Sequence, residues 1–153
     1  MKTRHHILAA LLAAALIGAD MAAAAPLPEK ADMLATNTVV AQYVDTVDLP
    51  CRFMTTLCPD HCDHPTRLAR FRVVTNENYE KPGKYGDEKM EADDIVTVDV
   101  KKDILGQAPE IAARIADLKP GDKVRLTITH YYVQQGQGQF PVRPAISLEL
   151  LPE

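Results

Sequence analysis

The sequence predicts a mainly β domain with one helix, arranged as a five-stranded OB-fold-like Greek-key barrel in the order β-β-β-α-β-β. Two observations predict it. Short runs of apolar residues alternate with polar ones, as in half-buried strands, whereas one later stretch has the period of a helix. The helical stretch stands between the third and fourth strand-like runs, which is its place in an OB-fold. Another small α+β or β-barrel domain is the alternative.

Each element follows from its local pattern. In the helical stretch Ile111, Ile115 and Leu118 form one stripe, and Pro109 suits the first turn. The fourth strand alternates cleanly, which places one set of side chains on the core face. That set is Val124, Leu126, Ile128, His130 and Tyr132. The strands are expected at 39–49, 68–75, 95–100, 124–133 and 145–151, the helix at 109–118, and a hairpin-like loop at 134–139.

The N-terminus has the features of a secretory signal peptide. Lys2 and Arg4 precede an apolar run at 7–19, and small residues follow it, so cleavage is expected after Ala24. The apolar run is too short to span a bilayer comfortably. We therefore expect a periplasmic or secreted protein that does not span the membrane after cleavage.

The leader divides the chain. The expected parts are a signal peptide at 1–24, a flexible lead-in at 25–37, rich in Pro and Ala, and the OB-fold-like domain at 38–153. The length of 153 residues suits one domain, and the net charge of −4 argues against a nucleic-acid partner. The sequence contains no phosphate-binding loop and no nucleophile elbow. An enzyme is therefore not expected, and thiol redox activity is the weaker alternative.

One short segment concentrates residues that bind metals. Cys58, Cys62 and His64 lie within seven residues, together with Asp60 and Asp63. Thiolate sulfur and imidazole nitrogen suit Cu(I) or Zn(II), and nearby carboxylates can orient the imidazole rings. If the segment makes a helical turn, the spacing of the two cysteines brings their sulfurs together. These residues predict a site for one thiophilic ion.

A tetrahedral site needs a fourth ligand or a water molecule, and His130 is the candidate. In an OB barrel the loops after the first and fourth strands border the same binding region, and His130 lies near the end of the fourth strand. His130 also belongs to the face expected to point inward. It is therefore either a ligand at the barrel rim or a core histidine with its hydrogen bonds satisfied.

The alternative for the cysteines is a disulfide. An exported protein usually pairs its thiols, and Cys58 with Cys62, or Cys51 with either, would crosslink the first loop. Because the chain has three cysteines, at least one is free, metal-bound or linked to another chain. Cys51 is most simply a spare thiol or an alternative disulfide partner.

Four segments carry a resemblance. MTTLCPDHCDH at 54–64, YEKPGKYGD at 79–87, LKPGD at 118–122 and THYYV at 129–133 resemble an uncharacterised family of small exported bacterial OB-fold-like proteins with a CPDxCxH motif. Separately, CPDHC is similar to the Cys-x3-Cys copper motif of the SCO copper chaperones. That similarity implies copper ligands at Cys58, Cys62 and His130. The thioredoxin-like βαβ pattern of that family is missing here, so the similarity is local.

The predicted function is metal storage, delivery or sensing in the periplasm. The metal site would consist of Cys58, Cys62, His64 and His130 and would hold Cu(I) or Zn(II) at the barrel rim. A periplasmic protein partner is possible under this hypothesis. The alternative is a disulfide-stabilised OB-fold interaction module that binds a protein or an oligosaccharide.

Overall fold

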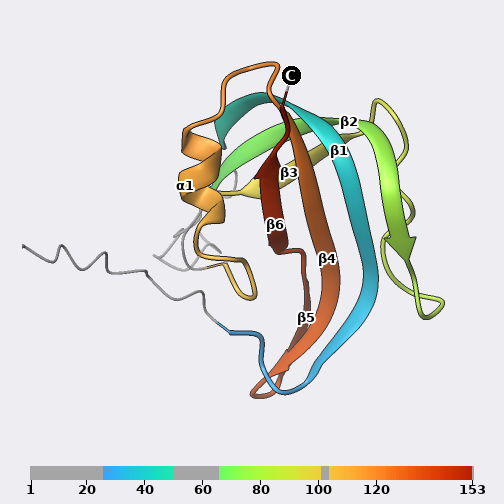
Figure 1. Cartoon of the computed structure of the whole chain (residues 1–153). Helices are drawn as coiled ribbons and strands as arrows, with labels where there is room; N and C mark the ends of the chain where they lie inside the picture. The colour runs from blue at the N-terminus through green and yellow to red at the C-terminus, as the bar shows by residue number, and fades with distance from the viewer. Residues whose placement is uncertain (1–25, 50–65, 101–103, 153) are drawn as a thin grey trace, which may run out of the picture.

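The computed structural model describes residues 26–49, 66–100 and 104–152, and in these ranges the protein is mainly β with one short helix. The prediction of a mainly β fold with one helix is therefore confirmed. The elements are β1 (Ala31–Leu49), β2 (Thr66–Glu80), β3 (Ile95–Asp99), α1 (Ile111–Ala116), β4 (Lys123–Gln135), β5 (Gly138–Val142) and β6 (Ala145–Leu150). All strand pairs are antiparallel, in the order β3-β2-β1-β4-β5, and β6 also pairs with β4. The described strands form one open, strongly curved sheet (Figure 1).

Two elements differ from the expectation. Residues 138–142, mostly expected as loop or left unassigned, form β5, which pairs with the last part of β4 after a turn at Gly136 with φ 60°. β6 pairs with the first part of β4, so two short strands share one edge, and Arg143 and Pro144 separate them. β1 begins at Ala31, so the second half of the expected flexible lead-in is strand.

β1 joins the two halves of the sheet. It pairs with β2 along one edge and with β4 along the other, and its register with β2 shifts at three places. Such bulges let a strand bend, which the strong curvature of β1 requires (Figure 1). Alternate residues of β1 face the concave side of the sheet and are buried. These are Ala35, Asn37, Val39, Ala41 and Tyr43.

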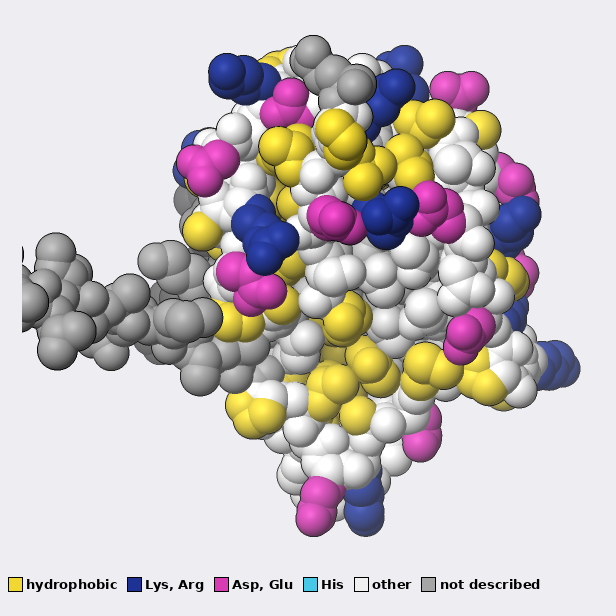
Figure 2. Space-filling view, viewed as in Figure 1, with side chains coloured by type: hydrophobic (Ala, Val, Ile, Leu, Met, Phe, Trp, Pro, Cys, Tyr) yellow, Lys and Arg dark blue, Asp and Glu magenta, His cyan; other side chains and the backbone are white. Residues whose placement is uncertain are grey.

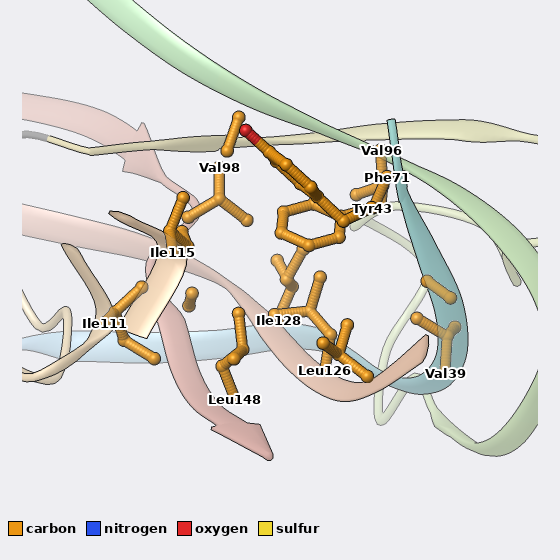
Figure 3. Packing of buried hydrophobic residues seen from close by; sticks show 14 of the residues in the cluster. Val39, Tyr43, Phe71, Val96, Val98, Ile111, Ile115, Leu126, Ile128 and Leu148 are labelled. Atoms are coloured by element: carbon orange, nitrogen blue, oxygen red, sulfur yellow. The ribbon is translucent and has the colours of Figure 1, made fainter. Parts of the chain in front are cut away.

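The concave side holds the hydrophobic core. Phe71 is fully buried, and its ring lies 5.5 Å from the ring of Tyr43 at an angle of 56°. α1 covers the core from one side, with Ile111 and Ile115 pointing toward the strands (Figure 3). Burial of an apolar side chain of this size stabilises the fold by about 1.5–3 kcal/mol. The helical stripe predicted from Ile111 and Ile115 is thus the face that packs on the sheet.

The segment before α1 bridges the outer strands. The side chain of Gln107 donates a hydrogen bond to the carbonyl of Asp99 at the end of β3, at 2.7 Å. Its Oε1 atom accepts one from the amide of Ala145 at the start of β6, at 3.2 Å. Arg114 of α1 donates to the carbonyl of Leu148 on β6, at 2.6 Å. Gln107 therefore connects β3 and β6, which do not pair with each other, and Arg114 connects α1 to β6.

The visible surface carries charges of both signs. Figure 2 shows acidic and basic side chains interspersed on one face, with no single-sign patch of any size. Within the described ranges, no helix is long and apolar enough to cross a membrane.

Candidate functional site

The predicted thiol ligands lie outside the described residues. Cys58, Cys62 and His64, and also Cys51, belong to residues 50–65, which connect β1 to β2. The last described pair before this segment is Leu49 with Thr66. The chain has no cysteine elsewhere, so any disulfide within the chain must join two of these three. The metal site, the disulfide and the redox alternative thus all remain predictions.

His130 is described, and it lies on the core face of β4 opposite Ala35 of β1. Only 9% of its side chain is exposed, and no histidine is visible on the face that Figure 2 shows. The prediction that its side chain points inward is confirmed. Tyr132, expected on the same buried face, is 40% exposed, because it lies beyond Ile128, the last β4 residue in the hydrophobic core cluster.

A carboxylate and a guanidinium accompany His130. Its Nδ1 atom lies 3.0 Å from Oδ1 of Asp87. Asp87 accepts two hydrogen bonds from Arg143, at 2.7 and 2.8 Å. The Nδ1 atom thus contacts the carboxylate of Asp87, whereas Nε2 has no hydrogen-bond partner within the described part of the chain. The three side chains form a charged cluster at the end of β4, which we call the Asp87 cluster.

Burial favours the neutral form of His130 by lowering its pKa. Burial lowers the pKa of His130, and the positive charge of Arg143 lowers it further, while the negative charge of Asp87 acts in the opposite direction. The hydrogen bonds from Arg143 hold the pKa of Asp87 below its usual value. The cluster therefore contains one ion pair and one uncharged imidazole.

The backbone around Asp87 is tightly fixed. Gly86 has φ 122°, and a Cβ atom there would lie 2.5 Å from the carbonyl oxygen of Leu34, so only glycine fits. The hydroxyl of Tyr79 donates a hydrogen bond to the carbonyl of Asp87, at 3.1 Å. The approach of Gly86 to Leu34 brings the segment between β2 and β3 close to the first residues of β1, and the Tyr79 contact connects it to β2.

Asn37 fixes the following residues. Its amide nitrogen donates to the carbonyl of Glu88 at 3.3 Å, and its amide oxygen accepts from the backbone of Met90 at 3.0 Å. The same oxygen accepts a hydrogen bond from Asn76 of β2, at 2.7 Å. Lys81 adds an ion pair with Glu88, at 2.5 Å. Residues 86–90, which we call the strap, are thus attached to β1 and β2. Through Arg143 they are also attached to the β5–β6 corner, which consists of the two residues between these strands, Arg143 and Pro144.

The register pairs His130 with the beginning of β1. His130 lies opposite Ala35, whereas the cysteine segment follows Leu49, fourteen residues further along β1. Because β1 and β4 are antiparallel, the end of β4 meets the beginning of β1. Since residues 50–65 lie outside the described residues, the expected approach of the cysteine segment to His130 stays a prediction. Among the described residues, no three His, Cys, Asp or Glu side chains gather as a metal site.

Sequence analysis missed Asp87, Arg143 and Asn37. Asp87 stands among many charges, and no spacing rule links it to Arg143, which is 56 residues away. Asn37 could have been found, since it lies two residues before Val39 and so shares its inward face, which predicts a buried polar group with several partners.

The chain matches no protein-family model, no curated protein and no solved structure.

Proposed function

We propose that this is an exported metal-binding protein that holds one thiophilic ion, Cu(I) or Zn(II), for storage, delivery or sensing. The proposed ligands are Cys58, Cys62 and His64, whose sulfur and imidazole atoms suit either ion.

We further propose that the domain is an OB-fold-like barrel. The strand order, the position of α1 between β3 and β4, and the bridge by Gln107 support that assignment.

One observation carries the proposal. All the proposed ligands belong to a single segment whose two ends, Leu49 and Thr66, are paired residues of the longest strand pair. A segment closed in this way starts and ends at one place, which lowers the entropy cost of bringing its ligands together. Asp60 and Asp63 lie beside these ligands in the sequence and are available to orient the imidazole of His64.

The proposed ligand set leaves His130 out. Two observations support this choice. His130 pairs with Ala35 near the beginning of β1, and its ring contacts Asp87, which is bonded to Arg143. Three protein ligands leave the fourth position of a tetrahedral ion open to water or to a ligand from another protein. An open position suits delivery of the ion better than a purely structural role.

A disulfide-stabilised interaction module is the second candidate function. It is favoured by the location of all three cysteines between β1 and β2, where a disulfide would close a short loop in an oxidising compartment. In that case the oxidised segment would shape a surface for a protein or an oligosaccharide, and no metal would be bound.

Elemental analysis of the protein purified from the exported fraction tests the first proposal. We expect about one Cu or Zn ion per chain, by tetrahedral S/N coordination. Cys62→Ser should lose most of the metal, while Cys51→Ser, the matched control in the same segment, should retain it. Metal-free protein in which Cys58 and Cys62 resist thiol reagents even after denaturation would instead support the disulfide.

A further inference from the structure

Two buried polar atoms near the strap have no hydrogen-bond partner among the described residues. They are Oδ1 of Asn76 and Nε2 of His130. A buried polar atom without a partner costs roughly 1–3 kcal/mol, which is regained when water reaches it. These atoms therefore favour a state in which this end of the sheet is solvated.

Directed contacts oppose that opening. The Asp87–Arg143 ion pair attaches the strap to the β5–β6 corner, and Asn37 holds it through Glu88 and Met90. The side chains of Asp87 and Arg143 are 30% and 50% exposed, so water reaches the ion pair, and its contribution is modest. The closed strap is thus held by a few contacts against a local cost of similar size.

Protonation of His130 would change this balance. Two charged groups act on its ring: Asp87 from the strap and Arg143 from the β5–β6 corner. The residue opposite on β1 is Ala35, which carries no charge. Asp87 already accepts two hydrogen bonds from Arg143. A protonated His130 ring would therefore be a buried cation that has to share the negative charge of Asp87 with Arg143.

We propose that the strap is a pH-sensitive closure, in which protonation of His130 releases residues 86–90 and exposes the polar end of the sheet formed by Asn37, Asn76 and His130. The proposal is independent of the metal site. Its direction follows from the closed state, where burial lowers the pKa of His130 below the value of about 6.5 for a solvated imidazole. Protons therefore bind more tightly when the strap is open, and acidification favours opening.

The size of the effect has a ceiling. If an open-state imidazole titrates near 6.5, lowering the pH from about 7.5 to about 5 can increase the open-to-closed ratio by at most about 30-fold. A smaller depression of the closed-state pKa gives a smaller increase. We therefore expect an increase of up to about 30-fold.

Amide hydrogen exchange of the full chain measures the ratio directly. After correction for the chemical exchange rate, exchange of the strap amides should rise on acidification by the stated factor. The amides of β2 around Phe71 serve as the internal reference and should not follow. In His130→Gln, which keeps a polar side chain but cannot titrate in this range, the rise should disappear.

A second variant keeps the test decisive if His130→Gln does not fold. Arg143→Gln removes a half-exposed side chain and frees Asp87 to pair with a protonated His130. The strap should then exchange faster near pH 7.5, and the effect of acid should shrink or reverse. The proposal is overturned if strap exchange is unaffected by pH in the wild type, if His130→Gln shows the same rise, or if Arg143→Gln keeps the full wild-type rise.

Discussion

The two parts of β1 differ in what they bury. In the middle of the strand Val39, Ala41 and Tyr43 face the core and belong to its hydrophobic cluster. Near its beginning the same face carries Asn37, which holds the strap by directed hydrogen bonds. Hydrophobic burial is non-directional and tolerates small shifts, whereas a hydrogen-bonded end depends on single atoms and on protonation. One strand thus combines a stable core with an end that can respond to its surroundings.

The largest effect should come from the apolar part. Phe71→Ala removes a fully buried ring and should lower the free energy of unfolding by about 3–5 kcal/mol, measured by denaturant titration. The matched control is Val74→Ala on the same strand, because Val74 is 46% exposed and should change stability by about 0.5 kcal/mol or less. Equal losses in the two variants would contradict the assignment of the core to the concave face.

Replacing Asn37 should have a smaller and more local effect. Asn37→Ala leaves Met90, Glu88 and Asn76 without their partner and should cost about 1–3 kcal/mol, since water can satisfy these groups once the strap lifts. Strap exchange should rise far more than exchange in the core. The control Asn78→Ala removes an exposed amide and should leave the strap closed. A uniform loss of protection over the whole sheet would show that Asn37 is not specific to the strap.

The loss of folding stability at low pH should depend in part on Asp87. Its pKa is lowered when folded, mainly by the hydrogen bonds from Arg143, so its contribution is complete above the unfolded pKa of about 3.9 and is lost as the pH falls through the folded value. Asp87→Asn lacks this contribution and should therefore show a flatter decline of the melting temperature below about pH 4. If the melting temperature declined equally steeply in wild type and variant, the ion pair of Asp87 with Arg143 would not stabilise the fold.

The smallest effect is expected on the convex face. Arg125 pairs with Glu77 and Glu149, and all three side chains are at least 36% exposed. Exposed ion pairs contribute about 0–1 kcal/mol, so Arg125→Ala should lower stability by about 1 kcal/mol or less. Thermal unfolding at low and at high salt measures this contribution. A loss comparable to that of Phe71→Ala would contradict the view that burial dominates.

Strong alternation made much of the fold predictable from the sequence. β4 and the stripe of Ile111 and Ile115 were recognised because a clear period marks which face is buried. β5 was missed because its sequence, GQFPV, has no alternation and its strand character comes from pairing with β4. The first residues of β1 were assigned to the flexible lead-in for a similar reason, because amino-acid composition alone does not show which strand a segment pairs with.

The candidate site was less predictable than the fold. The chemistry of Cys58 and Cys62 is local and can be inferred from residue type and spacing. The position of His130 relative to them depends on strand register, which local spacing does not contain. The contacts of Asp87 with Arg143 and His130 likewise arise only when the segment after β2 reaches the β5–β6 corner.

The most direct test of this account compares metal affinity in two histidine variants. His64→Gln removes a proposed ligand, and His130→Gln removes a buried ring near the other end of β1. Competition with a chelator should show at least about tenfold weaker metal binding in His64→Gln, because loss of a partner outside the ligand shell already costs about 10- to 100-fold. His130→Gln should bind the ion as tightly as the wild type. An equal loss of affinity in both variants would contradict the separation of the metal segment from the Asp87 cluster.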